Sequence, residues 1–157
     1  MARAGFWSIG GYEISFRKDG RWYADEEPIE NARIALLFSR HIRAGEDGGW
    51  VVDVGVDRQP VTVEDTALVV VAADGDRRRG FRIKTNDGIE EWLDPTTLRI
   101  GRDNVLYCDV DRGERGVITA RFLRPAYYAL AAEVEQDADG PVLACRGSRY
   151  PIRSDAS

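Results

Sequence analysis

Five Asp-Gly pairs divide the chain into short segments, and this feature most limits what it can fold into. They lie at residues 19–20, 47–48, 74–75, 87–88 and 139–140. Asp-Gly suits tight turns with positive φ, and between apolar stretches it is typical of β-hairpins. The first pair separates the alternating segment 12–17 from residues 21–23, which predicts a hairpin. The chain is therefore expected to consist mainly of short strands joined by turns.

One long segment has the period of a helix instead. Between residues 26 and 44, apolar side chains and His41 recur at the spacing of one helical face. This face carries Ile34, Leu37, Phe38, His41 and Ile42. We expect Pro28 in the first turn of this helix and Gly45 at its end. Arg124-Pro125 predicts the start of a second helix, whose apolar face carries Tyr127, Leu130, Ala131 and Val134.

The other segments have the composition of strands. Residues 68–73 are continuously apolar, so this strand is expected to be covered on both faces. The remaining predicted strands are 50–54, 60–64, 80–86, 89–93, 105–110, 117–122, 142–145 and 149–152. The order of elements lacks the strand–helix alternation of a parallel sheet. We therefore predict an α+β fold, mainly antiparallel sheet with two helices packed on it.

Charge and hydropathy exclude several classes of protein. Lys and Arg number 22 and Asp and Glu number 27, for a net charge of −5. Binding to phosphate backbones needs a basic face, so we expect no nucleic-acid partner. The longest apolar run, residues 67–73, is far shorter than the roughly 20 residues of a membrane helix. Residues 1–10 lack the apolar core of a secretion signal. We expect a cytoplasmic protein without membrane contact.

Few residues could carry chemistry. His41 is the single histidine, and we interpret it as a core-edge imidazole with one hydrogen bond; a general base is the alternative. Cys108 and Cys145 lie at positions expected in the core, where burial makes a thiol inert. No recognised nucleotide-binding or catalytic motif accompanies them. We therefore expect no catalytic residue, no metal site and no cofactor.

Asp65 stands between one predicted strand and the continuously apolar one. Its carboxylate could accept hydrogen bonds from nearby backbone N–H groups and fix the turn, and we favour this structural role. The alternative is a role in ligand binding. Glu64 and Asp65 do not form a paired acid and base by themselves, because neighbouring side chains on a strand point to opposite faces.

Several short motifs, taken in order, resemble one bacterial family. Asp19-Gly20-Arg21-Trp22 leads to Pro28-Ile29, residues 61–65 read VTVED, residues 84–88 read KTNDG, and residues 120–124 read ARFLR. In this order they resemble the uncharacterised domain-of-unknown-function family twelve-eighty-five, over residues 14–130. The family's Pro-Phe pair after Glu-Asp is absent, and Thr119 replaces its Glu before Ala-Arg, so the resemblance is to a divergent member.

The resemblance implies an α+β architecture of two small, repeat-like parts. It also implies a signalling-related role that has been proposed for the family, and it carries over no catalytic residue. We expect a single compact unit over residues 1–157. The alternative is a subdivision into an N-terminal part, 12–64, and a C-terminal part, 65–152.

Three functions stay open. The first is a non-enzymatic regulatory or interaction module with an unknown protein partner or a homo-oligomeric state. The second is a small-ligand sensor whose pocket lies near Asp65, Asn86 and Arg121. The third is an enzyme that uses His41 or Asp65 as a base. The sequence favours the first, because ample aromatic content comes without a recognisable catalytic constellation.

Overall fold

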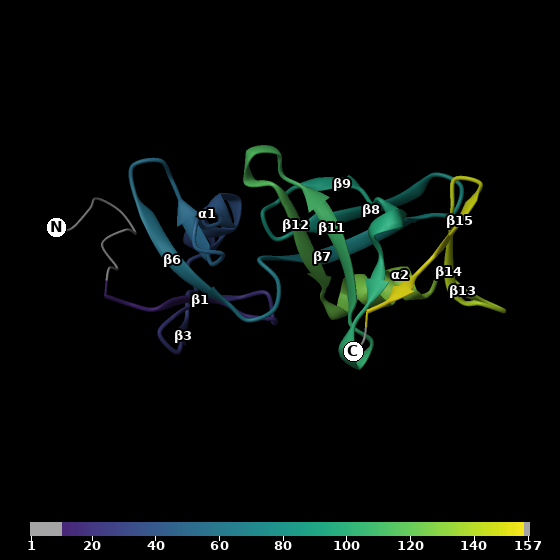
Figure 1. The fold of residues 1–157 in the computed structure, drawn as a ribbon, viewed down its shortest axis with the longest axis horizontal. Coiled ribbons are helices and arrows are strands. Elements are labelled where there is room, and N and C mark those ends of the chain that lie inside the picture. The colour runs from purple at the N-terminus through teal and green to yellow at the C-terminus, as the bar shows by residue number, and fades with distance from the viewer. Residues whose placement is uncertain (1–10, 156–157) are drawn as a thin grey trace.

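The computed structural model describes residues 11–155, in which three sheets and two helices share one core. The prediction that residues 1–10 hold no secretion signal lies outside these residues. Figure 1 shows the first sheet with α1 at one end of the molecule, the second sheet in the middle, and the third at the other end. Neither helix in the described part of the chain has the length and apolar character needed to cross a bilayer.

The first sheet has six strands in the order β3-β2-β1-β6-β5-β4. Its members are β1 (Ile14–Phe16), β2 (Trp22–Ala24), β3 (Glu27–Pro28), β4 (Ile42–Ala44), β5 (Trp50–Asp53) and β6 (Arg58–Val63). The predicted hairpin around Asp19-Gly20 is confirmed, since β1 and β2 pair antiparallel. In the centre, β1 pairs parallel with β6, with Ile14 opposite Val61.

The second sheet repeats this arrangement and adds one strand, in the order β16-β10-β11-β12-β7-β8-β9. Its members are β7 (Leu68–Asp76), β8 (Gly80–Thr85), β9 (Glu90–Trp92), β10 (Arg99–Ile100), β11 (Leu106–Asp111), β12 (Val117–Phe122) and β16 (Arg153–Ser154). Without β16, and read from its other edge, the order is β9-β8-β7-β12-β11-β10, which matches the first sheet strand for strand. Here β7 and β12 form the central parallel pair.

The third sheet is a small antiparallel meander. Its strands are β13 (Val134–Asp137), β14 (Gly140–Cys145) and β15 (Ser148–Pro151). Three short 3-10 helices complete the second half of the chain: η2 (Pro95–Thr97), η3 (Arg102–Asn104) and η4 (Gly113–Arg115).

The sheets are mixed, which corrects part of the predicted fold class. An α+β fold is present, but β1–β6, β7–β12 and β10–β16 pair parallel, so the prediction of mainly antiparallel sheet holds only in part. The parallel pairs join strands that are far apart in the chain, and turn signals report only on neighbouring segments. Another turn is also displaced: Asp74-Gly75 lies inside β7, and the chain reverses at residues 77–79.

The two predicted helices exist, but both are shorter than expected, since Val134, predicted on the face of the second helix, lies in β13. Helix α1 (Ala32–His41) begins after Asn31, whose side chain accepts hydrogen bonds from the backbone N–H groups of Arg33 and Ile34. Pro28 therefore lies in β3 and not in the first turn, and the helix ends before Gly45. Helix α2 (Arg124–Ala131) packs against β7, whose residues Leu68–Val70 are fully buried.

Candidate functional site

Asp65 and Arg121, two of the predicted site residues, form an ion pair. The Arg121 Nη1 atom lies 2.7 Å from Asp65 Oδ2, and the Tyr107 hydroxyl donates to the same oxygen at 2.8 Å. Burial, together with this bond to a carboxylate, raises the pKa of Tyr107 above its ordinary value of 10.0. The phenol therefore stays protonated near neutral pH and acts as a donor to Asp65.

Asn86, the third predicted residue, is engaged elsewhere. Its Oδ1 accepts from the Val69 backbone N–H at 2.8 Å, and its Nδ2 donates to Ser39 Oγ at 2.7 Å. Asn86 therefore ties β7 to helix α1. Asp65, Arg121 and Asn86 line three different cavities, so the structure brings together two of the three residues.

A cavity of about 530 Å³ lies beside Asp65. Its walls come from β5 of the first sheet, the segment between β6 and β7, and the β10–β12 region of the second sheet. The lining residues are Trp50, Asp65, Thr66, Ala67, Arg99, Gly101, Arg102, Tyr107, Val117, Thr119 and Asp155. Gly101 leaves space for an aromatic ring, since a Cβ atom there would lie 2.8 Å from Tyr107 Cε2.

The polar groups of this cavity are held by their neighbours. The Arg99 guanidinium lies 3.0 Å from Asp109 Oδ1 and 3.3 Å from Asp155 Oδ2, and it donates to Thr119 Oγ1 at 3.0 Å. Asp65, which also lines the cavity, is held by Tyr107 and Arg121 as described above. Groups fixed in this way can bind a ligand with little loss of side-chain freedom.

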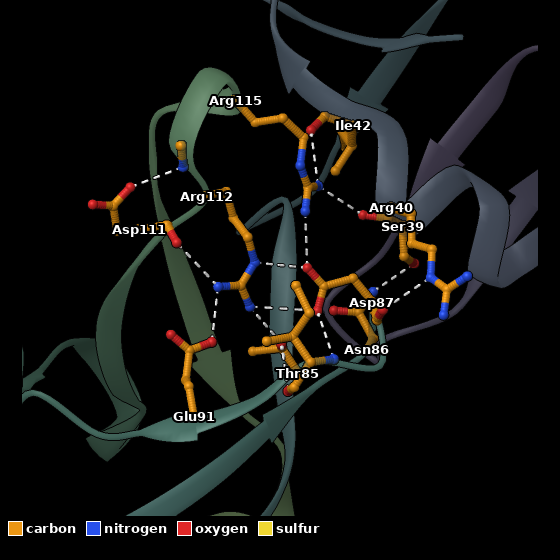
Figure 2. Close-up of polar contacts among 12 residues, drawn as sticks. Ser39, Arg40, Ile42, Thr85, Asn86, Asp87, Glu91, Asp111, Arg112 and Arg115 are labelled. Carbon is orange, nitrogen blue, oxygen red and sulfur yellow. Dashed lines mark hydrogen bonds and ion pairs between the residues drawn. The ribbon is translucent and has the colours of Figure 1, made fainter.

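A buried cluster of charges, centred on Asp87, lies at the junction of the first and second sheets (Figure 2). The side chain of Asp87 is 0% exposed. Its Oδ2 atom lies 2.8 Å from Arg112 Nε and 3.0 Å from Arg115 Nη2, and its Oδ1 accepts from the Thr85 hydroxyl at 2.5 Å. Arg112 also pairs with Glu91 at 2.8 Å.

Arg115 connects this cluster to the first half of the chain. Its Nη1 donates to the backbone carbonyls of Ser39 at 2.9 Å and Ile42 at 3.3 Å, at the end of α1 (Figure 2). Arg112 precedes η4 and Arg115 is its last residue, so this turn between β11 and β12 of the second sheet is bonded to the helix of the first. The Asp87 cluster is thus the charged part of the contact between the two sheets.

Ionisation of Asp87 is favoured in spite of its burial. Burial alone would raise the pKa of the Asp87 carboxyl, but hydrogen bonds from Arg112 and Thr85 outweigh it and lower this pKa below 3.8. Burial likewise disfavours the charge of Arg112, while Asp87 and Glu91 raise its pKa. The cluster therefore holds its charges through the neutral range.

We predict that this ionisation makes stability fall in acid. A carboxyl with a lowered folded-state pKa stabilises the fold at pH values above its unfolded pKa, and this contribution disappears as the pH falls through the folded-state value. The free energy of unfolding, measured by urea titration from pH 7 to pH 2, should therefore drop below about pH 4. The variant Asp87→Asn should show a shallower drop. Parallel curves of unfolding free energy against pH for the variant and the wild type would show that Asp87 is not the cause.

The sequence analysis missed the Asp87 cluster. Residues 86–88 have the composition of a turn, and Asp87 does lie in the turn between β8 and β9. Its side chain, however, meets Arg112 and Arg115 from a different hairpin, and nothing in the local sequence marks these partners. The one available signal is the pair of arginines, Arg112 and Arg115, beside Gly113 between the predicted strands 105–110 and 117–122.

The remaining candidates for chemistry do not form a nucleophile–base pair. His41 is half-buried, as expected for a residue at the edge of the core, but within residues 11–155 its imidazole makes no hydrogen bond, which corrects that part of its interpretation. Cys108 is buried as predicted, and burial raises the pKa of its thiol to about 12. Cys145 is buried and reduced. Over the described residues, no three His, Cys, Asp or Glu side chains are grouped to hold a metal ion.

Comparison with solved structures finds proteins of similar fold. A DUF1285 family protein from Silicibacter pomeroyi DSS-3 superimposes with a TM-score of 0.73 at 20% identity, over 92% of this chain and 81% of that one. A DUF1285 family protein from Shewanella baltica OS155 gives a TM-score of 0.60 at 20% identity, over 78% of this chain and 92% of that one. No family model and no curated protein matches the sequence. The resemblance predicted from the short motifs is thus confirmed at the level of the fold.

Proposed function

We propose that this chain, which has the fold of the DUF1285 proteins, is a divergent member of that family and a non-enzymatic regulatory module. In this proposal it binds a small organic ligand in the 530 Å³ cavity beside Asp65. The observation that carries the proposal is the set of polar groups already fixed around this cavity, which are Asp65, Tyr107 and Arg99.

The size and chemistry of the cavity fit a small molecule of mixed character. Ligand sites in proteins typically enclose about 300–1,000 Å³, with apolar walls and a few placed polar groups. Trp50 and Val117 supply apolar surface, while Arg99 and Asp65 supply charges of opposite sign. A ligand with a flat apolar part and at least one charged or hydrogen-bonding group would match this lining.

The origin of the cavity walls supports a regulatory role. Trp50 belongs to the first sheet, whereas Arg99, Tyr107 and Thr119 belong to the second. A ligand that touches both sheets stabilises the arrangement in which its contacts are best, and so shifts the population of conformers. Arg121 supports the site through Asp65, and Asn86 takes no part in it.

A thermal-shift screen over nucleotides and small metabolites tests the proposal. A ligand that binds only the folded protein should add about 2.7 kcal/mol of stability at 100 times its Kd. The variant Trp50→Ala removes one apolar wall, and it should weaken the binding of such a ligand by about 1.5–3 kcal/mol.

Trp92→Ala is the matched control, because Trp92 is 47% exposed and does not line this cavity. A ligand that stabilises the wild type and this control equally, but not Trp50→Ala, would support the site. A screen without any stabilising compound, or a ligand whose effect is unchanged in Trp50→Ala, would contradict the proposal.

A further inference from the structure

A second cavity, of about 340 Å³, lies where the end of α1 faces the turn between β11 and β12. It is lined by Arg40, His41, Arg43, Asp53, Arg112, Glu114 and Arg115. Four guanidinium groups thus meet two carboxylates and one imidazole, in a chain whose net charge is −5. Positive charge is therefore concentrated in this cavity.

Two of the four arginines are fixed in position by the Asp87 cluster. The side chains of Arg112 and Arg115 are only 4% and 15% exposed, and both lie within 3.0 Å of Asp87 Oδ2. Asp87 and Glu91 compensate the charge of these two arginines from behind. Arg112 and Arg115 therefore form a rigid floor of the cavity, and their side chains lose little conformational entropy when a ligand binds.

The other two arginines, Arg40 and Arg43, are held by backbone carbonyls, and Arg43 also helps to lower the pKa of Asp53 from a distance. Arg40 Nε donates to the Asp87 backbone carbonyl at 3.4 Å, and Arg43 Nη2 donates to the Glu114 carbonyl at 3.1 Å. Within residues 11–155 no carboxylate oxygen forms an ion pair with either of them. Asp53, at the end of β5, forms its own ion pair with Arg58 at 3.1 Å and accepts from the Gly55 backbone N–H.

We propose that this cavity is a binding site for a phosphate dianion, either inorganic phosphate or the phosphate group of a small monoester. Arg40 and Arg43 come from α1 and β4, and Arg115 comes from the opposite side, so donors approach from two directions. Such an arrangement matches a tetrahedral oxyanion with several acceptor oxygens better than a planar carboxylate, which one guanidinium fork can satisfy. A volume of 340 Å³ limits the ligand to a small molecule.

Binding here would also bridge the two sheets. The ligand would contact the end of the first sheet's helix and the η4 turn of the second sheet, beside the existing bonds from Arg115 to Ser39 and Ile42. This site is separate from the cavity beside Asp65, and its test does not depend on the function proposed above.

The single histidine makes a direct test possible. His41 lines the cavity, and the carbon-bound protons of its imidazole give the only histidine NMR signals of the chain. Inorganic phosphate is titrated at constant pH and constant ionic strength, with sodium chloride alone as the reference. The expected result is a saturable shift of the His41 signals, together with a phosphate-dependent rise of the thermal midpoint.

Substitutions on the same part of the chain separate specific binding from general charge effects. Arg43→Ala should weaken phosphate binding by about tenfold or more, as expected for the loss of one charge-assisted hydrogen bond. Arg33→Ala is the matched control, because Arg33 is an exposed residue of α1 outside the cavity. Arg40→Gln serves as a second variant in case Arg43→Ala does not fold, which circular dichroism checks.

A titration with phenyl phosphate distinguishes the two sources of the dianion. Tighter binding than inorganic phosphate supports a monoester as the natural ligand, and equal or weaker binding supports inorganic phosphate. A shift that stays linear and equals that caused by chloride would overturn the proposal. Equal losses in Arg33→Ala and Arg43→Ala would overturn it as well.

Discussion

Replacing Asp87 with Ala is expected to lower the free energy of unfolding by about 3–5 kcal/mol. The substitution removes the carboxylate that Arg112 and Arg115 share, and it leaves the Arg112 guanidinium with a 4% exposed side chain and only Glu91 as an ionic partner. Desolvated charges without a counter-charge are among the largest sources of destabilisation by a single substitution. Urea or guanidinium titration followed by circular dichroism measures the change.

Asp74→Ala is the matched control for this substitution. Asp74 lies on β7 and is exposed, so its loss should change stability by less than about 0.5 kcal/mol. Asp87→Asn should fall between the two, because the amide still accepts hydrogen bonds but brings no charge. A loss below about 1 kcal/mol for Asp87→Ala would show that solvent reaches and satisfies the two arginines.

Replacing Trp22 with Ala is expected to cost about 3–5 kcal/mol as well, for a different reason. The Trp22 ring is 2% exposed and lies 4.8 Å from the ring of Phe16 and 5.1 Å from that of Phe38. Its indole N–H donates to Ser39 Oγ at 2.9 Å. The substitution would leave a cavity between β1, β2 and α1 and remove one buried hydrogen bond.

Trp92→Ala offers a control with the same change in side chain at the surface. The Trp92 ring contacts the guanidinium groups of Arg82, at 5.0 Å, and Arg146, at 4.6 Å. Exposed cation–π contacts contribute about 0.5–1 kcal/mol, so the loss should stay near that range. Guanidinium denaturation of both variants measures the difference, and comparable losses would contradict the central place of Trp22 in the core.

Local patterns in the sequence predict most of the individual elements. Four of the five Asp-Gly pairs lie where a hairpin reverses, whereas Asp74-Gly75 lies inside β7, and the glycine of each pair has positive φ. The helical period between residues 34 and 42 predicts α1, although it cannot locate the first residue. Asn31 decides that start through its hydrogen bonds to Arg33 and Ile34, while Pro28 is also compatible with the strand that it actually joins.

Long-range partners are what the sequence does not reveal. The ion pair between Asp65 and Arg121 joins two of the residues that are predicted to share a site. Asn86, the third of them, instead bonds to Ser39. Asp87 has the appearance of a turn residue, because its role depends on two arginines from another hairpin. Such contacts depend on how distant strands and hairpins pack against each other, and the periodicity of one segment carries no information about this packing.

The central parallel pairs have a consequence for how the chain is made. In each large sheet the first strand pairs with the sixth strand along the chain, since Ile14 pairs with Val61 and Leu68 pairs with Ala120. At synthesis rates of about 5–20 residues per second, β1 and β7 each stay without their central partner for a time on the order of seconds. Such distant pairings also slow folding in solution. A nascent chain arrested between Leu68 and Ala120 would therefore carry one complete sheet and one open strand edge, the state most exposed to chaperones and to aggregation.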